Sequence, residues 1–422
     1  MSVEAADALG IDAQPRERLA VLVPELLLAG HLIDRAGMPH LIAAFGRDTM
    51  RDIAIDEWMG ASPIYSKRMQ RLLKFEGDSV ETIFKNLQLD IGSPPQFMDF
   101  RFALFDQNHG EFWLDHCGAL MDVEPMGPDY VQAMCHDIED PTFDATATAS
   151  NPRAQIRPIH RPPRQPANRQ PHCAWAVTID PSHEALPVPQ QAIEVGATRA
   201  AQHVLAPIDP DDDGLADYVG PLLEDLRLSD FSASALARIA EEVCVQGHLL
   251  SLAFLAATRR RVDSEEAAQE FSRHQFTGVA GIAAERLCAL VDGADDLETA
   301  AVVLSLSPAL LPVSYTGCRI EHGERLLLHV DRSSAAHADG AWPSLLGSDR
   351  LGPLDAIVAA VNPQLRCEVV SEDATELLVE IVLGETAQSE SPDVALTRFS
   401  TGAGFQFADR GQAVVLRIGP RG

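Results

Sequence analysis

The sequence predicts an α+β protein made of two tandem copies of one unit, each a helical block followed by an antiparallel sheet with a packed helix. Three observations support this expectation. The chain has 422 residues, which suits two domains of about 150–200 residues each. The spacing of apolar residues changes from three or four to two near residue 95. Short sequence matches then recur in the same order in the second half.

The elements of the first copy are predicted from their local patterns. Residues 18–89 have apolar side chains at helical spacing. The period of two that follows predicts strands at 96–105 and 110–117, and a helix is expected over about residues 128–149. A closing strand pair flanks a segment rich in proline and arginine, with its second strand at 173–180.

The repeat is defined by matches at nearly constant offsets. Residues 30–32 recur as 247–249, an offset of 217, and residues 109–111 recur as 322–324, an offset of 213. Two copies of one unit should pair as a pseudo-dimer, as homodimers pair the same surface about a two-fold axis. The predicted boundaries are 17–183 for the first copy, 184–216 for a linker rich in proline and aspartate, and 217–422 for a degenerate second copy.

Composition excludes several classes of function. The net charge of −29 argues against nucleic acid or an anionic membrane as a partner. The N-terminus lacks the basic and apolar regions of a signal peptide, and no apolar run has the roughly 18–20 residues of a membrane helix. Seven cysteines without a framework spacing favour a cytoplasmic protein with reduced thiols. We therefore expect a small-molecule partner, and homo-oligomerisation is left open.

The second copy suggests which residues of the first were added for function. At the offset of 213, the strand face that carries Trp113, Asp115 and Cys117 falls on the apolar Leu326, Leu328 and Val330. A buried carboxylate costs several kcal/mol unless it is paired or binds a ligand. We therefore expect a partner group to face Asp115.

The predicted helix shows a similar contrast. Cys135 and His136 precede Glu139 by four and three residues, so each is its neighbour on a helix. The second copy has no such group, and it has no thiol that corresponds to Cys173. Taken singly, each cysteine is more typical of a hydrophobic core than of a site. Taken together, the predicted catalytic residues are Asp115, Cys117, Cys135, His136 and Glu139.

Three mechanisms remain open for this cluster. A zinc or iron ion could be bound by Cys117, Cys135, His136 and Cys173. One of the thiols could be a nucleophile that a histidine activates. Asp115 and Glu139 could instead perform metal-free acid–base chemistry, with the thiols as lining. The metal and thiol mechanisms both suit hydrolysis of a small molecule, and a sensor or carrier that uses the same pocket is the alternative.

A group of arginines is the second candidate feature. Arg157, Arg161 and Arg164 form a positively charged island in an acidic chain, and with Trp113 they are predicted to bind an anionic substrate. The competing interpretation is a solvated hairpin loop with polyproline character.

The order of these motifs resembles a known family. The matching segments are LDHC ending at Cys117, MCHDIED around Cys135, and HCAW at Cys173. Over roughly residues 20–180 this order is similar to that of L-2-amino-thiazoline-4-carboxylic acid hydrolase-like proteins. The resemblance implies ring-opening hydrolysis of a small heterocycle. The arginine- and proline-rich insertion and the second copy depart from the family. A looser similarity to vinyl-reductase-type domains implies ligand binding instead.

Overall fold

The computed structural model describes residues 9–291 and 293–400. Its first half contains α1 (Arg16–Phe45), α2 (Arg47–Leu72), α3 (Val80–Leu87), β1 (Met98–Asp106), β2 (His109–Cys117), α4 (Gly118–Val123), α5 (Pro128–Gln132), α6 (Glu139–Thr148), β3 (Ala154–His160) and β4 (Cys173–Ile179). The connecting segment contains α7 (Gln190–Gly196) and α8 (Arg199–Gln202). The second half contains α9 (Ala233–Arg259), α10 (Glu265–Leu290), α11 (Leu297–Leu306), α12 (Val313–Thr316), β5 (Cys318–His322), β6 (Leu326–Asp331), α13 (Ala335–Asp339), α14 (Gly352–Val361), β7 (Leu365–Glu372), β8 (Glu376–Leu383) and α15 (Pro392–Thr397).

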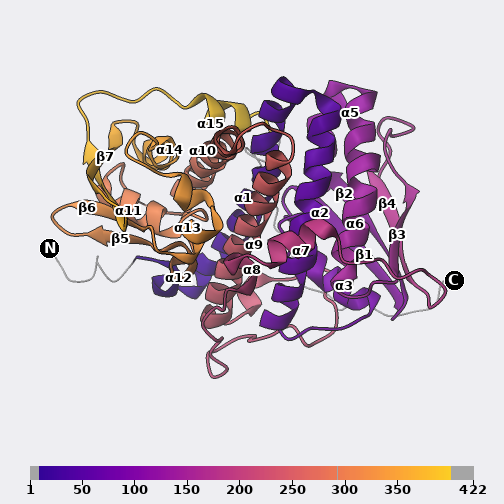
Figure 1. Cartoon of the computed structure of the whole chain (residues 1–422). Coiled ribbons are helices and arrows are strands. Elements are labelled where there is room, and N and C mark those ends of the chain that lie inside the picture. Colours follow the sequence, from indigo (N-terminus) through magenta and orange to yellow (C-terminus); the bar gives the residue numbers. More distant parts are fainter. Residues whose placement is uncertain (1–8, 292, 401–422) are drawn as a thin grey trace.

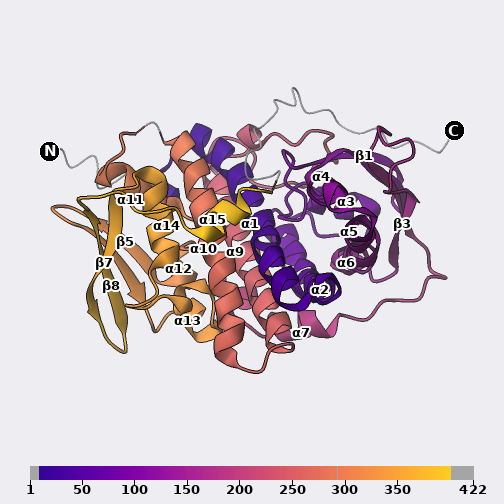
Figure 2. The same ribbon diagram turned by 90° about the horizontal axis from the view of Figure 1, so that it is seen from above.

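The described residues form two four-stranded antiparallel sheets, which confirms the α+β class. The strand orders are β1-β2-β4-β3 and β5-β6-β8-β7, so the same connectivity occurs in both halves. The two sheets lie at opposite ends of the molecule, and the long helices α1, α2, α9 and α10 fill the space between them (Figures 1 and 2). Both halves contribute to one continuous hydrophobic core.

Reciprocal contacts join the two halves. Glu25 on α1 pairs with Arg286 on α10, and Arg68 on α2 pairs with Glu242 on α9. Glu242 follows Glu25 by 217 residues, which is the offset of the helical repeat. A surface paired with its own copy about a two-fold axis gives such reciprocal contacts. They favour the pseudo-dimer, which stays a prediction.

The connecting segment and α9 are both packed into the protein. Helix α7 contacts α2 and α9, and α8 contacts α9, so part of the expected linker lies against the helical core. By length and composition alone α9 could span a membrane, but 89% of its apolar window is buried inside the protein, as in a core helix.

The strand register overturns the face that was assigned to Asp115. The inward residues of β2 are Gly110, Phe112 and Leu114, whereas Asp115 is exposed. A bulge places Asp115 and His116 opposite the single residue at position 99, and this returns Cys117 to the inward face.

The offset of 213 was also wrong for the strand faces. It matches Leu114, which points inward, to the half-buried Leu327, which lies between the buried Leu326 and Leu328. Two residues join β1 to β2, whereas three join β5 to β6. One additional residue exchanges the two faces of a strand, so the comparison placed Asp115 on the wrong side of the sheet.

Candidate active site

The structure brings four of the predicted residues together. Cys117 ends β2, Cys173 begins β4, and Cys135 lies in a π-helical turn, Ala133–Ile138, that leads into α6 at Glu139. All three thiols are buried. Each thiol lies close enough to Glu139 for the charge of its carboxylate to raise the pKa of the thiol. π-Helical turns inside α-helices occur frequently at functional sites.

Two other predicted members lie outside this cluster. The side chain of Asp115 is 50% exposed and lies 3.7 Å from Arg101 on the outer side of the sheet. The ring of His136 is half-buried, and its Nε2 is 2.7 Å from the carbonyl oxygen of Pro162. Asp115 therefore cannot share a site with the thiols. His136 is held by the loop that joins β3 to β4 rather than by a neighbouring cysteine.

The predicted substrate-binding residues are also placed elsewhere. Arg157 pairs with Asp144, Arg161 with Asp140, and Arg164 with Glu124. These acids, which lie far apart in sequence from the arginines, neutralise the expected positive island. Trp113 alternates with the inward residues of β2 and is half-buried on the outer face. None of these four residues lines the cavity described below.

The environment of the thiols disfavours a nucleophilic cysteine. Burial raises the pKa of Cys117 to about 12, and it raises the pKa of Cys135 and Cys173 well above the usual value. The nucleophile in thiol chemistry is the thiolate, which low-polarity surroundings suppress.

We expect Cys117, Cys135 and Cys173 to react slowly with a chromogenic disulfide reagent in the native protein. All seven cysteines should react rapidly in denaturant, because denaturation exposes them. The half-buried Cys288 is the internal reference for a more accessible thiol. A native Cys135 that reacts faster than Cys288 would restore the nucleophilic mechanism.

The spacing of possible ligand atoms bears on the expected zinc or iron ion. Within residues 9–291 and 293–400, His40, His274 and Asp393 are the group whose ligand atoms lie within 4.8 Å of one another. In these same described residues, the ligand atoms of the predicted set, Cys117, Cys135, His136 and Cys173, do not form a group within 4.8 Å.

A bound metal ion stays a prediction that elemental analysis of untagged protein can test. We expect any zinc or iron that co-purifies to be lost in His274→Ala, because His274 belongs to the group with ligating spacing. Cys135→Ala should retain it. Loss of the metal in Cys135→Ala and retention in His274→Ala would return the ion to the cysteine cluster.

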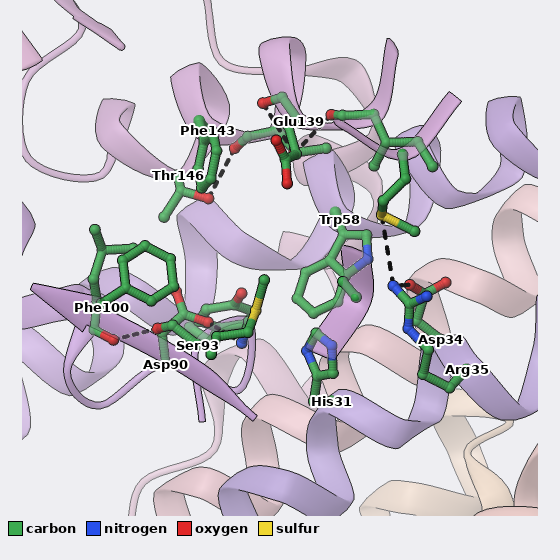
Figure 3. Close-up of a pocket in the computed structure, with 18 residues that line it drawn as sticks. His31, Asp34, Arg35, Trp58, Asp90, Ser93, Phe100, Glu139, Phe143 and Thr146 are labelled. Atoms are coloured by element: carbon green, nitrogen blue, oxygen red, sulfur yellow. Dashed lines mark hydrogen bonds and ion pairs between the residues drawn. The ribbon is translucent and has the colours of Figure 1, made fainter. Parts of the chain in front are cut away.

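A cavity of about 80 Å³ lies beside the cluster, between the sheet and the helices α1, α2 and α6. Figure 3 shows Glu139 projecting from one wall toward Trp58 and His31 on the opposite wall. Most of the lining is apolar, but five acidic or basic residues also contribute to it. They are His31, Asp34, Arg35, Asp90 and Glu139.

The charges on α1 form one side of this cavity. Burial and the nearby Arg35 lower the pKa of His31 to about 3, so its ring is neutral at pH 7. Its Nδ1 is 3.2 Å from the carbonyl oxygen of Ile91, and its Nε2 has no hydrogen-bond partner. Burial raises the pKa of Asp34, although Arg35 and a hydrogen bond from Trp58 oppose this effect.

Asp90 lies on the loop between α3 and β1. Burial raises the pKa of Asp90 to about 6, while hydrogen bonds from the Gly92 backbone and the Tyr65 hydroxyl stabilise the charged form. The loop rests directly on α1 at Gly30, where an added Cβ would lie 2.4 Å from Ile91. A glycine is needed for this close approach, which holds Asp90 near His31.

The pKa of Glu139 is raised further from its ordinary value than that of Asp90. Burial raises the pKa of Glu139 to about 8, and Asp140 adds to this effect, whereas Arg161 and Arg35 oppose it. Its Oε2 is buried without a hydrogen-bond partner. Glu139 is therefore mostly protonated at pH 7 and can donate a proton to a molecule in the cavity.

The second half keeps the scaffold and lacks most of these groups. The residues that follow Asp34, Arg35 and Asp90 by 217 positions are Ser251, Leu252 and Ser307. His31 corresponds to His248, whose Nε2 is 2.8 Å from the carbonyl oxygen of Leu311. The contrast between the copies therefore holds for the cavity, although the strand comparison that first suggested it was wrong.

Sequence reasoning missed His31, Asp34, Arg35 and Asp90. A signal was present, because Asp34 and Arg35 interrupt a run that is otherwise strongly apolar and helical. Charged residues are almost never fully buried unless they are paired or functional.

The chain matches no family model, no curated protein and no solved structure. The resemblance to thiazoline hydrolase-like proteins therefore stays a prediction.

Proposed function

We propose that the cavity of the first half is the active site of an enzyme that hydrolyses a small molecule, with Glu139 as the proton donor. The observation that carries this proposal is the buried carboxyl group of Glu139, which lines the cavity with one oxygen unpaired and whose pKa burial raises to about 8. A neutral acid near the operating pH is what proton donation to a leaving group requires. The cytoplasm is the proposed location, because all seven cysteines are free thiols.

Asp90 is the proposed partner base. Hydrolysis needs one group that activates water and another that protonates the leaving atom. The pKa of Asp90 is about 6 and that of Glu139 is about 8, so at pH 7 the first is mostly ionised and the second mostly protonated. Environments that separate two acids in this way commonly divide the base and acid roles between them. Under this assignment the thiols lie beside the cavity without lining it, and they do not react.

The proposal can be tested before the substrate is known. Wild-type protein and Glu139→Gln are each incubated with a bacterial metabolite extract and with 2-amino-thiazoline-4-carboxylic acid, the ring that names the resembling family. Mass spectrometry then identifies compounds that gain one water. We expect at least one compound to be hydrolysed by the wild type and not by the variant. Equal hydrolysis by both proteins would exclude Glu139 as the proton donor.

A sensor or carrier is the second candidate, and the apolar lining of the cavity favours it. Its distinguishing result is a compound that co-purifies with the wild type, is released on denaturation and is recovered chemically unchanged. An enzyme should instead convert that compound in the presence of water.

A further inference from the structure

A second cavity of about 240 Å³ adjoins the first. Arg35, Met134 and Ile138 line both cavities, so a wall one side chain thick separates them. The second cavity is strongly apolar and rich in methionine. Its lining includes Met38, Met50, Met126, Met134, Ile42 and Leu396. Methionine has three rotatable bonds and a polarisable sulfur, and it adapts to ligands of varied shape.

Arg35 is the unusual member of the wall. Its side chain is 6% exposed, yet its Nε has no hydrogen-bond partner. Its Nη2 donates a hydrogen bond to the sulfur of Met134, at 3.6 Å, and lies 3.6 Å from the carboxylate of Asp34, a distance too long for a strong hydrogen bond to oxygen. A buried guanidinium normally forms several close hydrogen bonds with an anion. The site around Arg35 is therefore incomplete.

The other charged groups at the two cavities do not complete it. Asp34 accepts a hydrogen bond from Trp58, and Glu139 is protonated at neutral pH. Asp122 lines the second cavity, but its Oδ2 is 2.7 Å from the hydroxyl group of Ser400. Among the described residues that line the cavities, Arg35 is the permanent cation.

We propose that the two cavities form one binding site for a small organic acid with an apolar chain. The guanidinium of Arg35 binds the carboxylate as a fork, which supplies the missing hydrogen bonds. The apolar chain lies among the methionines of the second cavity. Rotation of Met134 joins the two spaces, and the reacting part of the molecule then lies beside Glu139. This last placement rests on the proposed function, whereas the binding mode does not.

The test measures binding without turnover. Isothermal titration calorimetry with octanoate, octanol and butyrate separates the contributions of the carboxylate and the chain. We expect octanoate to bind the wild type at least about tenfold more tightly than either of the others. The binding mode is judged from the wild type without any reaction, so failure of the proton-donor assignment would leave this result unchanged.

Variants separate the contribution of Arg35 from that of the apolar second cavity. Arg35→Met should weaken octanoate at least about tenfold and leave octanol unchanged, since methionine keeps the length and removes the charge. Met50→Trp fills the second cavity, where Met50 is buried, and should weaken both compounds. Arg366→Met, which removes an exposed cation from β7, is the matched control and should change neither.

Several results would overturn the proposal. These are no binding of octanoate, equal affinity for octanoate and octanol, or octanoate binding that Arg35→Met leaves unchanged. If Arg35→Met does not fold, Arg35→Lys keeps the charge and removes the fork. It should still prefer octanoate to octanol while binding octanoate more weakly than the wild type. An affinity for octanoate in Arg35→Lys equal to that of the wild type would exclude the fork.

Discussion

Replacing Glu139 with glutamine should lower kcat by about 10²–10⁴. It should also raise the stability of the variant relative to that of the wild type as the pH rises. The loss of kcat follows because the amide cannot donate a carboxylic proton to the leaving group. Once a substrate is identified, kcat/KM of the wild type should fall above about pH 8, where Glu139 ionises. The variant should lack this decline.

The stability effect follows from the raised pKa. Below the ordinary pKa of 4.5, Glu139 is protonated in both the folded and unfolded states. As the pH rises toward about 8, the unfolded chain releases this proton and the folded protein retains it, so the wild type loses stability. The advantage of Glu139→Gln in free energy of unfolding should grow by about 1.4 kcal/mol per pH unit, or about 3–4 kcal/mol between pH 5 and pH 8.

Urea denaturation at several pH values measures this difference. Any packing cost of the amide is independent of pH, so it does not affect how the difference in free energy of unfolding changes with pH. Glu184→Gln, which removes an exposed carboxylate, is the control. A difference between Glu139→Gln and wild type that stays constant with pH would show that Glu139 is already ionised in the folded protein. The proton-donor assignment would then fail.

Breaking the pair between Arg68 and Glu242 should produce the largest loss of stability. Arg68 binds both carboxylate oxygens of Glu242, with Nε–Oε1 and Nη2–Oε2 distances of 2.7 and 2.8 Å. Their side chains are 11% and 3% exposed, respectively. We expect Arg68→Met to cost about 3–5 kcal/mol, because the variant leaves a buried carboxylate without its partner.

A double-mutant cycle separates the pair from its surroundings. Arg68→Met combined with Glu242→Met should cost less than the sum of the single variants, because neither charge is then left buried alone. Arg366→Met is the control on an exposed pair with Glu368 and should cost at most about 1 kcal/mol. A cost below 1 kcal/mol for Arg68→Met would mean that the contact between the two halves contributes little to stability.

Local patterns predicted much of the fold and part of the site. The change of apolar spacing near residue 95 correctly separates the helices α1 to α3 from the strands β1 and β2, since both periods reflect local backbone geometry. The shared helix face of Cys135 and Glu139 follows from the same geometry. Their proximity to Cys117 and Cys173 required only that the strands and the helix pack on one another.

Tertiary structure alone decided which face of the sheet each strand residue occupies and which residues it contacts. Asp115 was assigned to the core from its sequence position, but the bulge beside it and the longer hairpin in the second half reversed that assignment. A strand has two faces, and a shift of one residue exchanges them. No periodic pattern reports such a shift.

The sequence by itself determined the α+β class and the order of the elements. It also predicted Cys117, Cys135 and Cys173 beside Glu139, together with Asp115 and His136, which lie outside that cluster. The tertiary structure decided that the cavity beside this cluster is lined by His31, Asp34, Arg35 and Asp90. It also decided that Arg157, Arg161 and Arg164 pair with acids and do not line the cavity. The physical reason is that the charge state and the partner of a side chain depend on burial and on residues far away in the chain. Sequence spacing reports neither.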